Sequence, residues 1–309
     1  MRTHTSQLLL TPLMLGACGP IHEAPTSTQG RAPLIDAASS EAPSVTSKSE
    51  LDIAPVAPAV PANGIDPLSL PDPAPGIDHA FRAERLLDAG DLPGALESLR
   101  RHLASNPETT ALLLRIGRLF RSLGQPERAR VALLRAEQRE PDAVDVLLEL
   151  GRLEMAVDDP KAAQVWGRRG VKLQPDDARL WNLLGRSAMA RSAFQSAEFA
   201  YRRAVELAPT HGMYLNNLGL LYVLQRDGER AVSALEASLE SFGSDAPRFV
   251  YNNLGLGREL QGDLQGAARA FREALLKDPG YVRAHVNLER IQSMRVAKVD
   301  ALSETPNTP

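Results

Sequence analysis

The sequence predicts an all-α protein built as a stack of similar helix pairs. Three residue types recur in one register with a period of 34 residues. Glycines mark the first helix of each pair at Gly117, Gly151, Gly185, Gly219 and, after 36 residues, Gly255. Alanines follow them after 12 residues and prolines after 24, at Ala129, Ala163, Ala197, Ala231, Ala267, Pro141, Pro175, Pro209 and Pro279. A fixed period of this length is typical of a helical repeat array.

Each period contains two amphipathic helices. In the fourth unit we expect the first helix over residues 178–190 and the second over 194–207, because apolar residues recur there at three- and four-residue spacing. Glycine inside a helix costs about 1 kcal/mol relative to alanine. Its recurrence in the first helix, with alanine recurring in the second, therefore indicates that the two helices cross closely. Proline ends each unit because it cannot continue a helix.

This pattern resembles the tetratricopeptide repeat family. The fourth unit carries the resemblance in Trp181, Leu184, Gly185, Ala197, Tyr201, Ala204 and Pro209, and the sixth in Leu254, Gly255, Gly262, Ala267, Phe271, Ala274 and Pro279. The resemblance implies a right-handed superhelical solenoid of six helix-turn-helix units over residues 76–281. A capping helix is expected over 282–298, because the pattern of a first helix continues there without a second, and residues 299–309 are expected to be a disordered tail.

Two units depart from the pattern. The third has Gly167 and Gly170 where the family favours an aromatic residue and an alanine, which predicts a weak second helix with Trp166 turned inward in compensation. The fifth is two residues longer than the others and ends in the turn-rich residues 243–247, which predicts a loose joint to the sixth unit.

The first quarter of the chain differs in composition from the repeats. Residues 18–75 are rich in proline, alanine and serine and lack apolar periodicity, so they cannot bury enough surface to offset the entropy of ordering, and we expect a disordered spacer. Residues 1–17 combine the basic Arg2 with an apolar stretch, and they end before Cys18, the single cysteine.

This start resembles the signal peptide and lipobox of bacterial lipoproteins. The resemblance implies cleavage before Cys18 and acylation of that residue, with membrane attachment through it. We then expect a place in the cell envelope, on the periplasmic side of the outer membrane. The alternative is a cytoplasmic protein that keeps Met1.

The residues with chemical function are scattered. The six histidines form no ligand-spaced pair, and no glycine loop is suited to cradle phosphate, so we expect no catalytic residue, no metal, no cofactor and no small-molecule substrate. The whole chain has a formal net charge of −3 and the repeat block is close to neutral, so we expect no nucleic-acid binding. An enzyme subunit whose partner chain supplies the chemistry stays an alternative.

The resemblance implies that the first helices line a concave groove, with the second, fifth, ninth, twelfth and thirteenth residues of each unit facing inward. These positions hold arginines in the first half (Arg118, Arg121, Arg152, Arg179 and Arg186), asparagines in three successive units (Asn182, Asn216 and Asn252), and apolar residues in the second half (Leu220, Val223, Leu224, Leu256 and Leu260). They predict a groove for an extended protein or peptide segment with an acidic and an apolar part, the asparagine amides meeting its backbone.

Two other interpretations of the groove remain open at this point. The arginines would be occupied if they pair with Glu149 or Asp145, and the chain's own tail would be enough to cover the apolar half. The neighbouring Asn217 and Asn253 match a residue common in the repeat and are expected to be structural. The leading hypothesis is a lipid-anchored interaction scaffold or assembly factor of the bacterial envelope, similar in layout to pilotin-type and other outer-membrane repeat lipoproteins. The alternative is a cytosolic scaffold or adaptor.

Overall fold

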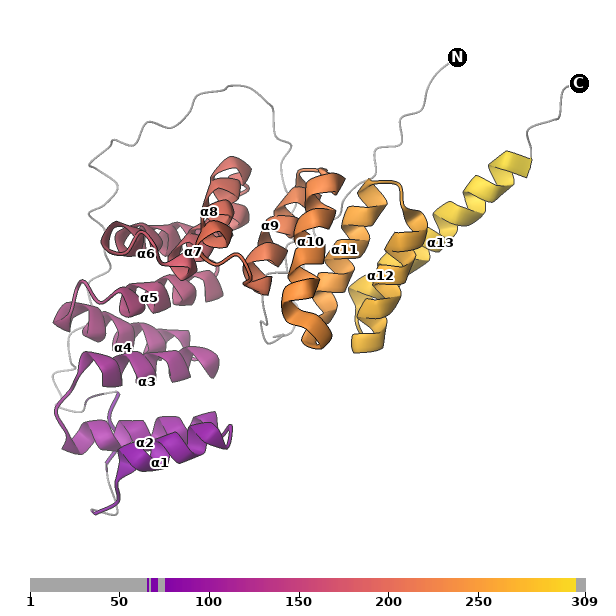
Figure 1. Ribbon diagram of the computed structural model, residues 1–309. Helices are drawn as coiled ribbons and strands as arrows, with labels where there is room; N and C mark the ends of the chain where they lie inside the picture. The colour runs from indigo at the N-terminus through magenta and orange to yellow at the C-terminus, as the bar shows by residue number, and fades with distance from the viewer. Residues whose placement is uncertain (1–65, 67, 72–75, 304–309) are drawn as a thin grey trace, which may run out of the picture.

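The structure is a computed structural model that describes residues 66, 68–71 and 76–303 (Figure 1). Every secondary-structure element in these residues is a helix, which confirms the all-α prediction. The first three units contain α1 (His79–Asp88), α2 (Leu92–Ser105), α3 (Thr110–Ser122), α4 (Pro126–Arg139), α5 (Val144–Ala156) and α6 (Pro160–Leu173). The next three contain α7 (Ala178–Ala190), α8 (Phe194–Leu207), α9 (Gly212–Leu224), α10 (Gly228–Phe242), α11 (Arg248–Leu260) and α12 (Leu264–Lys277), followed by α13 (Val282–Ser303).

The ends of the helices follow from local chemistry. Several second helices begin at an aspartate whose side chain accepts a backbone N–H of the first turn, at Asp91, Asp159, Asp227 and Asp263. The turn before each second helix contains one residue in the left-handed region, with φ between 57° and 80°, at Gly90, Gly124, Asp158, Ser192, Arg226 and Gly262. This conformation reverses the chain sharply enough to bring the two helices of a unit together.

The recurring glycines allow the first helix of a unit to cross the second closely. A Cβ atom at Gly185 would lie 2.4 Å from the ring of Tyr201, and one at Gly255 would lie 2.4 Å from the ring of Phe271. No side chain fits at such distances without displacing its neighbour. The predicted close crossing is therefore present in both units.

In the third unit, side chains of the following unit fill the space that an aromatic residue of the second helix fills in the fourth and sixth units. The space against Gly151 is filled by Leu183 of the following unit, at 2.3 Å from an added Cβ, and Leu184 and Leu180 occupy the space beside Gly167 and Gly170. Trp166 is buried as expected. The leucines of α7 thus replace packing that α6 cannot supply, and α6 is an uninterrupted helix.

The solenoid curves with its first helices inside. Successive first helices contact one another from α3 to α11, whereas the second helices make no comparable contact with each other within the described residues. The side with the shorter distance between units is the inner side of the curve. The surface formed by α3, α5, α7, α9 and α11 is therefore the inner face, and the second helices form the outer face.

Both ends of the array differ from the expected boundaries. Helix α13 packs on α12 and continues through residues 299–303, which were expected to belong to the tail. The first proline after its start is Pro306, so no proline interrupts α13 before residue 303. At the other end, Leu68 is fully buried against α2, although residues 18–75 were expected to be a spacer.

The expected signal peptide, Cys18 and the spacer other than residues 66 and 68–71 lie outside the described residues. Among those that the structure does describe, no helix is both long and apolar enough to cross a membrane.

Candidate protein-binding site

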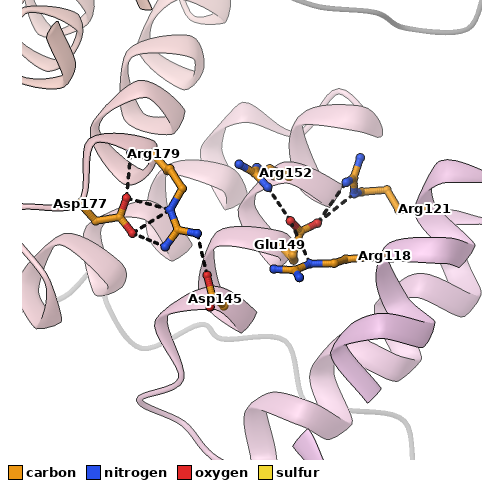
Figure 2. Close-up of polar contacts among 7 residues, drawn as sticks. All are labelled: Arg118, Arg121, Asp145, Glu149, Arg152, Asp177 and Arg179. Carbon is orange, nitrogen blue, oxygen red and sulfur yellow. Dashed lines mark hydrogen bonds and ion pairs between the residues drawn. The ribbon is translucent and has the colours of Figure 1, made fainter. Parts of the chain in front are cut away.

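Three arginines on the inner face surround one buried carboxylate (Figure 2). The side chain of Glu149 is only 2% exposed. Its oxygens lie 2.6 Å from Arg152 Nη1, 3.1 Å from Arg121 Nη2 and 3.4 Å from Arg118 Nε. The three arginine side chains remain 28% to 40% exposed. Three positive charges and one negative charge leave this group of four residues, here called the arginine cluster, with a net charge of +2.

The repeat places these residues together. Arg118 on α3 and Arg152 on α5 hold the same position in successive units, and Arg121 lies on the face of α3 that is turned toward α5. Glu149 is the one acidic residue in the buried run from Val146 to Leu150. A carboxylate buried among apolar side chains needs cationic partners. Glu149 therefore fixes the arginines in place but neutralises only one of them.

Arg179, at the edge of the inner face, is fully paired. It binds Asp177 through Nη2 at 2.6 Å and through Nε at 3.0 Å, and its Nη1 lies 2.9 Å from Asp145 (Figure 2). Burial by itself would raise the pKa of the Asp177 carboxyl. The hydrogen bonds that it accepts from the side chain and backbone of Arg179 outweigh burial and lower this pKa. Arg179 pairs with two carboxylates, so it offers no excess positive charge to a ligand.

Arg186 continues the column of Arg118 and Arg152 one unit further along the inner face. Its Nε is buried and has no hydrogen-bond partner, and the side chain makes no ion pair with any residue that the structure describes. A buried guanidinium nitrogen without a partner is costly. Arg186 therefore adds a positive charge to this face and has capacity for another hydrogen bond.

The predicted asparagines join the units to one another. Asn217 Nδ2 donates to Asn182 Oδ1 at 2.8 Å, and Asn253 Nδ2 donates to Asn216 Oδ1 at 3.0 Å. Asn287 in α13 repeats this bond at 3.0 Å to Asn252, the third residue of the expected groove set. We call these six residues the asparagine ladder.

The ladder leaves its amides little capacity for a partner. Asn216 and Asn252 are buried, and Asn182 is half-buried. The expectation that these asparagines meet a partner's backbone is not supported, because each bonds across a unit junction instead. Asn217 and Asn253 are structural, as expected.

The apolar half of the expected groove is largely interior. Leu220, Val223 and Leu256 are buried in the core of the last units, while Leu224 and Leu260 are half-buried at its border. The first helices α9 and α11 contact each other directly, so side chains at these positions pack between the units. The structure therefore differs from the predicted apolar groove, and the candidate site is reduced to its cationic half.

Sequence reasoning proposed the arginines but did not identify Asp177, nor Asn287 as the last step of the ladder. The signal for Asn287 was its place in the repeat register, 34 residues after Asn253. In the part of the chain that the structure describes, no group of three or more His, Cys, Asp or Glu is placed to hold a metal ion.

Comparisons with known proteins agree with this geometry. Models of the tetratricopeptide repeat match residues 82–145 and 216–282, residues 121–186, and residues 178–211. None of the curated proteins matches the chain.

Solved structures show the same fold. PilW, described as a widely conserved type IV pilus biogenesis factor, is similar with a TM-score of 0.62 and 14% identity, over 68% of this chain and 96% of that chain. A chain of the APC/C hetero-tetramer Cut9–Hcn1 gives a TM-score of 0.61 and 18% identity over 69% of this chain and 45% of its own length. A thermophilic repeat protein of Thermus thermophilus, TTC0263, gives a TM-score of 0.50 and 19% identity, over 60% of this chain and 99% of that chain.

The stacked helix pairs, the crossing glycines and the inner face define a helical solenoid that acts as a protein–protein interaction scaffold. With repeat models matching from residue 82 to residue 282, the chain belongs to the tetratricopeptide repeat family.

Proposed function

We propose that this scaffold binds an extended acidic segment of a partner protein along the inner face of units two to four. The observation that carries the proposal is the arginine cluster, in which one buried carboxylate holds three partly exposed arginine side chains. The cluster is pre-organised, because ion pairs and packing already fix the side chains, so a ligand loses little entropy in ordering them. Guanidinium groups bind carboxylates through paired, charge-assisted hydrogen bonds.

The segment is expected to be acidic without a large apolar part. The leucines and the valine that would receive such a part are mostly buried in α9 and α11. Arg186 extends the positive surface toward the fourth unit, so a ligand would run across the first helices from α3 to α7.

We expect a fluorescein-labelled peptide of alternating Asp and Glu to bind the full chain in fluorescence anisotropy. The double variant Arg152→Gln/Arg186→Gln should weaken this binding by about tenfold or more, because it removes two charge-assisted contacts. Binding should also weaken as salt is raised from about 50 mM to about 300 mM, since partly exposed charges are screened over about 10 Å at 0.1 M salt. Glutamine is preferred to glutamate here because a glutamate at position 152 would repel Glu149.

The matched control is Arg202→Gln/Arg203→Gln, which removes the same charge from α8 on the outer face. If this control weakens binding as much as the inner-face variant, the peptide responds to overall charge and the proposed site is wrong.

We further propose that the scaffold is a lipoprotein of the bacterial cell envelope, attached through acylated Cys18. The support is the short apolar stretch that ends before the single cysteine. The fold that the chain shares with PilW is compatible with an assembly role, although 14% identity is evidence for the fold alone.

Intact-mass spectrometry of the protein from a bacterial host tests the anchor. We expect a chain that begins at Cys18 and carries the additional mass of acyl groups, and we expect Cys18→Ser to abolish that species. A mature chain that begins at Met1 or Arg2 would support the cytoplasmic alternative, and the apolar start would then have no targeting role.

A further inference from the structure

A short segment before the first unit is bound to the outer face by backbone hydrogen bonds. Leu70 donates its N–H to the backbone oxygen of Arg100 at 3.1 Å. The side chain of Arg100 returns two bonds, from Nε to Leu68 O at 2.9 Å and from Nη2 to Ser69 O at 3.3 Å. One residue of α2 therefore binds the backbone of three consecutive residues of the segment, a contact that needs no particular side chain. Within the segment Ser69 donates its N–H to the backbone oxygen of Asp66 at 3.2 Å, so the chain makes a turn there.

Two side chains of the segment supply specificity. Leu68 is fully buried and belongs to the same apolar cluster as Leu99 and Leu103 of α2. Asp66 accepts a hydrogen bond from Arg135 Nη1 of α4 at 2.7 Å and another from Leu68 N at 2.9 Å. The apolar cluster thus accommodates leucine, and the guanidinium of Arg135, which also pairs with Glu108, holds a carboxylate two residues earlier.

We propose that α2 and α4 form a second peptide-binding site, which recognises an Asp-x-Leu turn and is occupied in cis by Asp66 and residues 68–70 of the same chain. The site lies on the second helices, and so on the outer face, away from the arginine cluster of α3 and α5. It is independent of the function proposed above, because it shares no residue with that cluster.

The cis ligand has a strong advantage over a free one. Residue 70 is joined to the start of α1 at His79 by a short connection, so the segment is held near its site at an effective concentration on the order of millimolar. A free peptide of the same sequence should therefore bind only when the cis segment is disabled.

The experiment uses a fluorescein-labelled peptide with the sequence of residues 63–71 and variants of the full chain. We expect the variant Asp66→Ala/Leu68→Ala to bind the peptide at least about tenfold more tightly than the unmodified chain does, because its cis ligand has lost both specific contacts. Adding Arg135→Gln to that variant should abolish the gain. Adding Arg203→Gln, which removes a partly exposed charge from α8, far along the array from this site, should leave it unchanged.

A variant that fails to bind the peptide, or binds it no better than the unmodified chain, would overturn the proposal. So would a gain that survives Arg135→Gln. Hydrogen exchange of the unmodified chain gives a second measurement that does not depend on the variant folding. The Leu70 amide should be protected, and Arg135→Gln should speed its exchange about tenfold or more. If light scattering shows a dimer whose dissociation removes that protection, a second copy supplies the segment and cis occupancy is wrong.

Discussion

Replacing Glu149 with Gln is expected to destabilise the protein by about 2–3 kcal/mol and, at the same time, to strengthen its binding of an acidic peptide. The substitution keeps the shape of the side chain but removes the one negative charge among three guanidinium groups. The stability cost lies between that of a surface pair and that of a fully buried pair, because the arginines stay partly in water. The opposite effect on binding follows because the net charge of the cluster rises from +2 to +3.

Urea denaturation followed by circular dichroism measures the first effect, since urea leaves the ionic strength unchanged. Glu206→Gln is the matched control, because Glu206 pairs with Arg203 at an exposed site, and it should change stability by less than about 0.5 kcal/mol. The cost of Glu149→Gln should also shrink in an Arg118→Gln/Arg121→Gln background, where less positive charge remains to be neutralised. A Glu149→Gln protein as stable as the unmodified one would show that the arginines do not need their buried partner.

Replacing Asn216 with Ala should cost about 2–4 kcal/mol and should loosen the last units more than the first. Asn216 is fully buried, and its Oδ1 is the acceptor for Asn253 Nδ2. Without it, the buried amide of Asn253 loses its bond across the junction between α9 and α11, and a small cavity remains. Stability in a repeat array is a sum of unit and junction contributions, so a weakened junction acts locally.

Hydrogen exchange followed along the chain tests this prediction. Amides of α11 and α12 should exchange faster in Asn216→Ala, whereas those of α3 and α4 should be unaffected. Asn182→Ala serves for comparison, because Asn182 is a half-buried end of the ladder and should cost only about 1 kcal/mol. Uniformly faster exchange throughout the chain would contradict a role confined to one junction.

The repeat period was sufficient to predict the helix pairs and their close crossings. Gly185 and Gly255 occupy the places where an aromatic ring of the second helix comes too near for any side chain, and recurrence at a fixed spacing reveals such a constraint. The positions of the arginines were also predictable, because residues one period apart lie side by side along the inner face. That Glu149 neutralises only one of them required the structure.

Features that join one unit to another were harder to predict. Asn216 looks available on a single helix, and only the approach of α11 shows that its amide is already bonded. The sequence of α9 alone predicted an apolar groove, because it does not show that the next unit covers these residues. The segment around Leu68 was predicted to be part of a disordered spacer, because the residues around it have that composition. Its position depends instead on two contacts, from Arg100 and Arg135.

The exchange of packing between the third and fourth units limits how this protein can be re-engineered. In most units, a side chain of the second helix fills the space left by the glycine of its own first helix. At Gly151 that space is filled by Leu183 of the following unit. Units three and four therefore form one inseparable module. A shortened or extended array should keep α5 to α8 together.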